Sequence, residues 1–150
     1  MKKVLIAIDG SDSSIKALDI GGKLAEKFGS ELYLVHIARL GDFYDPILLG
    51  PEFTEVLESL KREGKDITDL LKEKGNKILK AGIARLGSGV PVAKEIVKLG
   101  NPAEGIIKTA EEEGVDIIVL GPHSKRKSLI MGSVAREVVE LSPCSVLVAR

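Results

Sequence analysis

Residues that could bind a phosphate follow the apolar run that ends at Leu120. Gly121 is followed by three consecutive cations at 125–127 and then by Gly132 and Ser133, where a helical pattern begins. Glycines let a backbone approach a ligand, and the N–H groups and positive dipole of a helix N-terminus favour an anion. Ser133 could cap this helix and offer its hydroxyl. Two simpler interpretations stay open, namely plain helix capping and a solvated basic loop.

A carboxylate and two histidines are the other candidates for chemistry. Asp9 follows the apolar run 4–8, where it could accept hydrogen bonds from ribose hydroxyls, cap the next helix or stabilise the turn. His36 and His123 have no evident nucleophile or acid partner. We therefore expect His36 to complete an apolar strand and His123 to be an exposed loop residue. The sequence contains no G-x-G-x-x-G after the first run and no G-x-x-x-x-G-K-[ST], which argues against the usual dinucleotide and P-loop sites.

Five short runs of β-type residues must position these groups, at 4–8, 31–37, 93–98, 116–120 and 145–149. The run 117–120 is apolar throughout, which is typical of a strand buried on both faces of a parallel sheet. Helical patterns lie between the runs, at 13–28, 50–84, 101–114 and 133–141, and the second reads as one long amphipathic helix. This order predicts a single α/β domain over 1–150, a doubly wound open five-stranded parallel sheet with helices on both faces, Rossmann-like. Its crevice should lie beyond the carboxyl ends of the strands, where the strand order reverses.

Composition excludes several classes of protein. The 150 residues contain 22 Lys and Arg against 22 Asp and Glu, so the overall charge of a nucleic-acid or polybasic membrane binder is missing. No apolar run approaches the roughly 18 residues of a membrane span, and the N-terminal run stops at Asp9, too early for a secretion signal. Cys144 is the single cysteine, so no intramolecular disulfide can form. We expect a cytoplasmic protein with neither a nucleic-acid nor a membrane partner.

Six segments in the same order make the whole sequence resemble the universal stress protein family, whose fold is adenine nucleotide alpha hydrolase-like. They are Ala7-Ile8-Asp9-Gly10-Ser11, Leu34-Val35-His36-Ile37, Gly100-Asn101-Pro102-Ala103-Glu104-Gly105-Ile106-Ile107, Asp116-Ile117-Ile118-Val119-Leu120-Gly121, Gly132-Ser133-Val134-Ala135 and Pro143-Cys144-Ser145-Val146-Leu147-Val148. The resemblance implies a cytosolic stress-response sensor or adaptor. It also implies a homodimer formed through the last strand, at Val146, Leu147 and Val148.

The resemblance further implies a ligand, because one branch of the family binds ATP and the other binds no nucleotide. In the binding branch the aspartate after the first strand contacts the nucleoside, the residue after the second strand's histidine lines the adenine pocket, and G-x2-G-x9-G-[ST] holds ribose and phosphates. The expected ligand is ATP or AMP, with or without Mg²⁺. The expected binding residues are Ala7, Ile8, Asp9, Ile37, Leu120, Gly121, Ser124, Lys125, Gly132, Ser133 and Val134.

Two departures from the family pattern keep alternatives open. Ser124 stands where the second motif glycine belongs, and the interval from Gly121 to Gly132 is two residues shorter. One alternative is therefore a protein of the same fold that binds no nucleotide and acts through protein partners. Another is an ATP-using enzyme of the PP-loop class, but residues 9–14 lack the paired glycines of its loop. Since no catalytic constellation is evident, we expect no enzyme, although slow ATP hydrolysis would not need one.

Three of the five aromatic residues, Phe43, Tyr44 and Phe53, cluster in a stretch punctuated by Gly and Pro just after the second expected strand. Such a loop could form a lid over the crevice or a contact between subunits. Local packing of the same side chains is the alternative.

Overall fold

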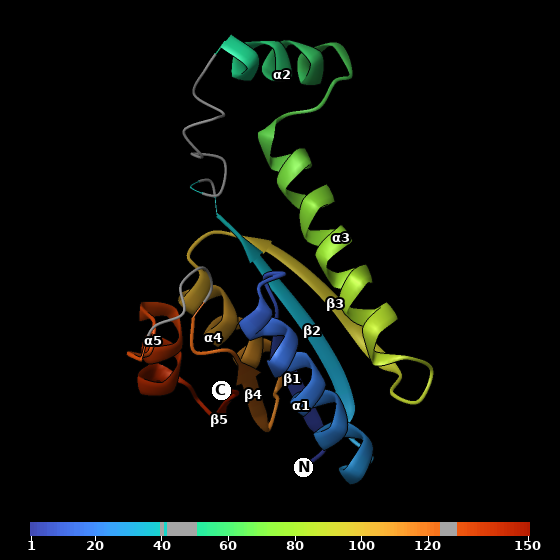
Figure 1. Ribbon diagram of the computed structural model, residues 1–150, viewed down its shortest axis with the longest axis vertical. Helices are drawn as coiled ribbons and strands as arrows, with labels where there is room; N and C mark the ends of the chain where they lie inside the picture. Colours follow the sequence, from blue (N-terminus) through green and yellow to red (C-terminus); the bar gives the residue numbers. More distant parts are fainter. Residues whose placement is uncertain (40, 42–50, 124–128) are drawn as a thin grey trace.

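A computed structural model describes the chain except residues 40, 42–50 and 124–128, and it describes no side chains for 51–53. The described elements are β1 (Lys3–Ala7), α1 (Asp12–Phe28), β2 (Glu31–Ala38), α2 (Pro51–Arg62), α3 (Ile67–Leu86), β3 (Val92–Leu99), α4 (Pro102–Glu113), β4 (Ile117–Leu120), α5 (Ser133–Leu141) and β5 (Ser145–Val148). Figure 1 shows their arrangement. All five strands that the sequence predicts are present, with ends that differ by at most two residues. The phosphate-loop residues Ser124 and Lys125 and most of the aromatic stretch lie outside the described residues.

The five strands form one sheet of order β3-β2-β1-β4-β5 in which every neighbouring pair is parallel. The chain builds the sheet outward from β1 to β3 and then returns to the other side of β1 with β4. Ile6 of β1 accordingly pairs with Leu34 of β2 and with Val119 of β4. The predicted doubly wound fold is confirmed, and its strand order reverses between β1 and β4.

Helices cover both faces of the sheet (Figure 1). α1 and α3 pack on one face, and α4 and α5 pack on the other. Val4 and Ile6 belong to the core on the α1 and α3 side, whereas Leu5 between them belongs to the core on the opposite side. All three are fully buried, which explains why the strand is apolar at successive positions from Val4 onward rather than at alternate ones.

The single long helix expected over 50–84 is wrong, because the structure has two helices, α2 and α3, with a break between them. Gly64 adopts a left-handed backbone with φ +69, which ends the first helix. Asp66 then caps α3 by accepting from the N–H of Asp69 at 3.0 Å, and the Asp69 carboxylate accepts from the N–H of Asp66 at 3.0 Å. Figure 1 shows α2 beyond the N-terminal end of α3, away from the sheet. None of the described helices is long and apolar enough to cross a membrane.

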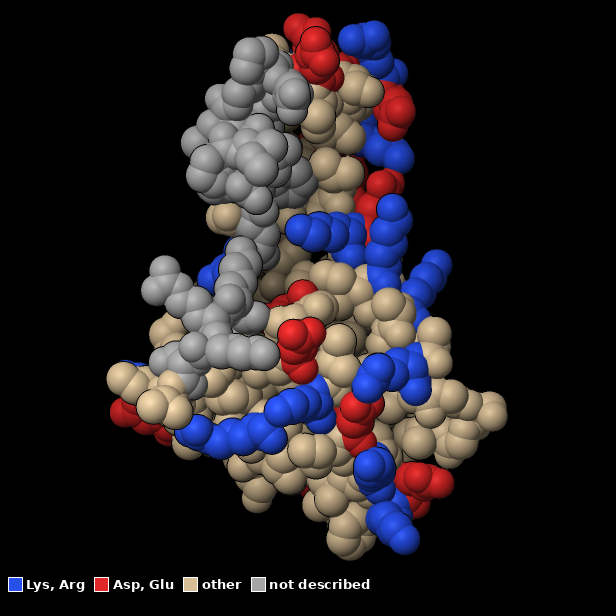
Figure 2. Space-filling view, in the orientation of Figure 1, with Lys and Arg blue, Asp and Glu red and all other residues tan. Residues whose placement is uncertain are grey.

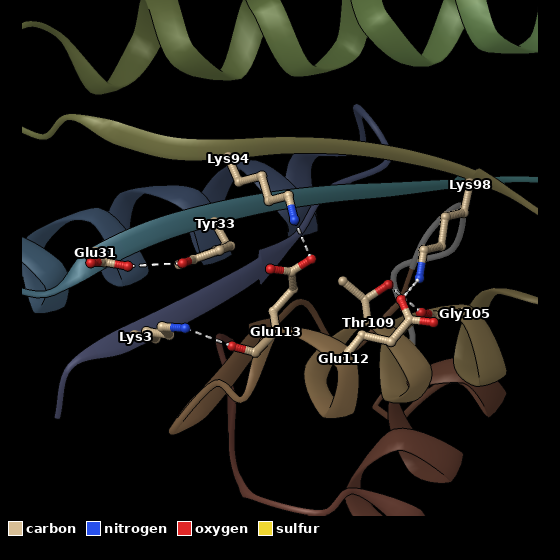
Figure 3. A network of polar contacts seen from close by, with 9 residues as sticks. All are labelled: Lys3, Glu31, Tyr33, Lys94, Lys98, Gly105, Thr109, Glu112 and Glu113. Carbon is tan, nitrogen blue, oxygen red and sulfur yellow. Dashed lines mark hydrogen bonds and ion pairs between the residues drawn. The ribbon is translucent and has the colours of Figure 1, made fainter.

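Lysines from two strands neutralise the acidic end of α4 (Figure 3). Lys94 and Lys98 of the edge strand β3 contact Glu113 and Glu112 at 2.6 and 2.5 Å. Lys3 of β1 donates to the main-chain oxygen of Glu113 at 2.9 Å. Solvent screens pairs of this kind, so we regard them as minor contacts between the edge strand and α4.

Candidate functional site

A cavity of about 600 Å³ lies at the carboxyl ends of β1, β2 and β4, and we call it the crevice. One side is formed by α3, and the other by the first residues of α4 and α5. Nine of the eleven expected binding residues line it, namely Ala7, Ile8, Asp9, Ile37, Leu120, Gly121, Gly132, Ser133 and Val134. The other two, Ser124 and Lys125, lie outside the described residues. The crevice therefore lies where the sequence analysis expects it, at the carboxyl ends of the strands where the strand order reverses.

Asp9 stabilises the turn that leads from β1 into α1. Its Oδ1 accepts a hydrogen bond from the N–H of Ser11 at 2.9 Å, and its side chain is exposed at the crevice. The cap of α1 is Ser11 instead, whose hydroxyl oxygen accepts from the N–H of Ser14 at 3.2 Å. Since Oδ2 of Asp9 has no hydrogen bond to any described residue, that oxygen is available to a donor in the crevice.

The two crevice glycines have packing roles of their own. A Cβ on Gly121 would lie 2.7 to 2.8 Å from the hydroxyl oxygen, the Cβ and the carbonyl carbon of Ser13, so the end of β4 approaches the start of α1 too closely for any side chain. The N–H of Gly132 donates to the carbonyl oxygen of Pro122 at 2.7 Å, and a Cβ there would lie 3.0 Å from the same oxygen. These glycines shape the crevice before any ligand is considered.

The N-terminus of α5 opens onto the crevice without a side-chain cap. The expectation that Ser133 caps this helix is wrong, because the extended backbone of Gly132 (φ −65, ψ 164) and its carbonyl, which accepts from Arg136, make Gly132 the cap. Ser133 is the first helical residue. The N–H groups of Ser133, Val134 and Ala135 have no hydrogen-bond partner in the described part of the chain, and all three residues line the crevice.

This terminus differs from those of α1, α3 and α4, which are capped by the side chains of Ser11, Asp66 and Asn101. Unpaired N–H groups and the helix dipole together make a helix N-terminus attractive to an anion. A ligand anion at α5 would supply the acceptor that the chain's own side chains supply at α1, α3 and α4.

The two histidines are held by main-chain oxygens. His36 is buried in β2, as expected, and its Nδ1 donates to the carbonyl of Ile8 at 2.8 Å. His123 was expected to be exposed, but it is half-buried because its Nε2 donates to the carbonyl of Ile130 at 2.9 Å. That bond joins the two described ends of the loop between β4 and α5. Both rings line the crevice.

Sequence reasoning missed helix residues on both sides of the crevice. Leu71, Lys74 and Ile78 of α3 line it on one side, and Pro102 and Ile106 of α4 line it on the other. The apolar stripe of α3 was visible in the sequence, but not which of its turns would face the strand ends. Among the described residues, Asp9, Arg39 and Lys74 are the charged groups of the lining.

The crevice thus joins apolar walls, one exposed carboxylate and one uncapped helix terminus. Ile37 shows how rigid the walls are: it is 8% exposed, and its side chain packs directly on Gly105 of α4. This set of groups suits a ligand with a flat apolar body, hydroxyls and an anionic end. An adenine nucleotide has all three.

Comparison with known proteins shows that the whole chain is similar in sequence to one family. The sequence profile described as the universal stress protein family matches residues 1–150. Universal stress protein YxiE of Bacillus subtilis strain 168 is 37% identical over 156 residues, which cover 99% of this chain and 98% of that protein.

Two solved structures share the fold. The crystal structure of a universal stress protein in complex with cAMP superposes with a TM-score of 0.69 at 22% identity, covering 99% of this chain and 97% of the other. The universal stress protein from Archaeoglobus fulgidus in complex with dAMP gives 0.66 at 20% identity, covering 100% and 98%.

Proposed function

The chain belongs to the universal stress protein family, and from this premise we propose that it is a stress-response sensor or adaptor that binds ATP or AMP in the crevice. The observation that carries the proposal is the uncapped N-terminus of α5, which lines the same cavity as the exposed carboxylate of Asp9. Two proteins of the same fold are described as complexes with cAMP and dAMP, which supports an adenine nucleotide as the ligand.

In the proposed complex each part of the nucleotide meets a matching group. The adenine lies between apolar side chains such as Ile37, the ribose hydroxyls donate to Oδ2 of Asp9, and the phosphates accept from the N–H groups of α5. Each hydrogen bond to a charged group contributes about 1.5 to 3 kcal/mol. We propose that Lys125 and its basic neighbours assist at the phosphates. Mg²⁺, when present, arrives with the phosphates of ATP, as is usual for this ion.

Titration calorimetry with AMP, with ATP and Mg²⁺, and with adenosine tests the proposal. We expect saturable binding of the nucleotides, and no heat at ligand concentrations up to about millimolar refutes it. Asp9→Ala should weaken both adenosine and AMP by about 10- to 150-fold through loss of the ribose contact. Asp12→Ala is the matched control, because Asp12 is an exposed acid at the start of the same helix that does not line the crevice.

The second candidate is a protein of the same fold that binds no nucleotide and acts through protein partners. Ser124 in place of a glycine and the shortened loop favour it, because both alter the phosphate end of the site. Mass spectrometry of small molecules that copurify with the chain separates the candidates. A nucleotide retained through purification excludes the second one.

We propose that the protein binds its nucleotide without catalysing a reaction and acts in the cytoplasm. An ATP hydrolysis assay tests the first point. Turnover that survives purification and disappears in Asp9→Ala would restore the enzyme interpretation.

We propose a homodimer formed through β5. This strand is at the edge of the sheet, and Val146, Leu147 and Val148 are only half-buried there. An unpaired apolar edge favours strand addition from a second copy. Analytical ultracentrifugation that shows a monomer at micromolar concentration would exclude this dimer. We also propose that 1–150 unfold as one domain, which requires a single transition in urea.

A further inference from the structure

A second cavity, of about 330 Å³, lies between α1 and α3, and nothing in the proposed function uses it. We call it the α1–α3 groove. Its lining is formed mostly by aliphatic side chains and glycine backbone. The lining residues from β1 to α1 are Ile8, Gly10, Ser14, Ile15 and Leu18, and those from α3 are Lys74, Lys77, Ile78, Ala81, Gly82 and Arg85.

The α1–α3 groove is separated from the crevice by the Ile78 side chain. Ile78 lines both cavities, and its Cγ1 lies 3.7 Å from the position that a Cβ would take on Gly10. Ile8, which is buried, and Lys74 also line both cavities. A ligand in the α1–α3 groove would therefore occupy a volume of its own, next to the nucleotide but not in its place.

The two ends of the α1–α3 groove differ in charge. At one end Arg85 donates to both carboxylate oxygens of Asp19, each at 2.8 Å, so these charges are paired. At the other end Lys74 and Lys77 are exposed and form no ion pair or hydrogen bond with another described residue. The nearest acid on the same helix, Glu73, is bonded to Lys65 at 2.8 Å. Figure 2 shows Lys and Arg side chains gathered along α3 on this face of the molecule.

The length and volume of the α1–α3 groove limit what could fill it. A helix rises about 1.5 Å per residue, so the stretch from Lys74 to Arg85 spans roughly 16 Å. The volume is near the lower end of the range for small-molecule sites. A single alkyl chain is a small enough occupant for a cavity of this volume.

We propose that the α1–α3 groove binds a free medium-chain fatty acid anion. Its alkyl chain lies along Ile15, Leu18 and Ala81, which removes apolar surface of both partners from water. Its carboxylate lies at Lys77, a cation that lines the α1–α3 groove but not the crevice. The paired charges of Arg85 and Asp19 close the far end.

Calorimetric titration with decanoate, below its micelle concentration and without nucleotide, tests the proposal. We expect saturable binding that weakens about fourfold for each methylene removed from the chain, the equivalent of about 0.8 kcal/mol. Binding that is insensitive to chain length, or absent up to about millimolar decanoate, overturns it. AMP should not displace decanoate, and competition between them would assign the fatty acid to the crevice instead.

Two pairs of variants locate the site. Ala81→Leu fills the α1–α3 groove and should weaken decanoate at least tenfold. Ala84→Leu adds the same side chain at an exposed position of α3 that does not line the cavity, so it should have no effect. Equal effects of the two variants overturn the proposal. Circular dichroism establishes that both variants are folded.

The second pair tests the head group. Lys77→Glu should weaken decanoate about fivefold and leave neutral decanol unchanged, whereas Lys80→Glu, at an exposed lysine outside the lining, should change neither. Decanol weakened as much as decanoate would refute the head-group assignment. Because Lys77 does not line the crevice, AMP affinity stays constant in this pair. If the unmodified protein binds decanoate but no AMP, the nucleotide proposal fails and the fatty acid proposal still holds.

Discussion

Replacing Ser133 by proline removes one N–H donor from the N-terminus of α5 and should leave the helix intact. Ser133 is the first helical residue, and its N–H has no partner among the described residues. Proline is favoured at the first helical position, because the N–H that it lacks would have no partner within the helix. Gly132 before it has φ −65 and ψ 164, the extended conformation that a residue preceding proline prefers. The substitution is therefore a nearly pure deletion of one anion contact.

The expected loss follows from the value of one hydrogen bond to a charged acceptor. Such a bond is worth about 1.5 to 3 kcal/mol, so AMP should bind Ser133→Pro about 10- to 150-fold more weakly. Adenosine, which has no phosphate, should bind both proteins equally. Ser133→Ala is the control, because it removes the hydroxyl and keeps the N–H.

Titration calorimetry of the three proteins with AMP and adenosine measures these differences. Calorimetric unfolding should give the same Tm for Ser133→Pro and Ser133→Ala within a few degrees. The reasoning is refuted if Ser133→Pro binds AMP as tightly as Ser133→Ala does. A parallel loss of adenosine would mean that the substitution distorts the crevice rather than removing a phosphate donor.

Three further predictions concern stability. Gly121→Ala should lower the free energy of unfolding by about 1 to 3 kcal/mol in urea, because its Cβ would meet the backbone of Ser13 at 2.8 Å. Leu79→Ala should cost about 2 to 5 kcal/mol in the same assay, since Leu79 is fully buried between α3 and the sheet. Hydrogen bonds from the N–H groups of Lys3 and Lys2 hold the pKa of Asp116 below its usual range. This carboxylate therefore stabilises the fold above about pH 4 and loses that effect as the pH falls through its folded-state pKa, so Asp116→Asn should unfold with less dependence on acid.

The first of these predictions has a control at an open position, and each of the three has an outcome that would contradict it. Gly89→Ala, with no atom within 4 Å of its Cβ, should leave stability nearly unchanged, and a loss as large as that of Gly121→Ala would contradict the packing argument. A loss below 1 kcal/mol for Leu79→Ala would mean that the core collapses around the deleted atoms. An acid titration with the same slope in Asp116→Asn and in the unmodified chain would show that the carboxylate does not couple to folding.

Much of the crevice lining could be predicted because it lies near the carboxyl ends of strands or at the start of a helix. Asp9, Ile37, Gly121 and Gly132 are far apart in the sequence, but parallel strands bring their carboxyl ends to one edge of the sheet. The wall formed by α3 could not be predicted in the same way. A helical stripe identifies the face that is buried, whereas the position of Ile78 along the sheet depends on how the helix packs.

The sequence contains a signal for the break between α2 and α3, but the helical repeat of apolar residues outweighed it in the prediction. Gly64 and the pair Asp66 and Asp69 have the spacing of a helix stop followed by a capping box. The apolar residues nevertheless repeat at helical intervals on both sides of the break, so the period alone favoured one continuous helix. In the structure the backbone of Gly64 is left-handed, and the chain forms two helices rather than one.

The sequence by itself determined the α/β class and the five strands, because the apolar runs of buried parallel strands are visible in local residue types. Its ordered motifs also determined the family. Only the tertiary structure shows that α5 has no side-chain cap. It alone also shows that Ser13 lies too close to Gly121 for any other residue to fit at that position. The same holds for the α1–α3 groove, whose walls come from two helices that residues 29–66 separate in the sequence. Contacts of this kind depend on the distance between packed elements, which no local pattern of side chains specifies.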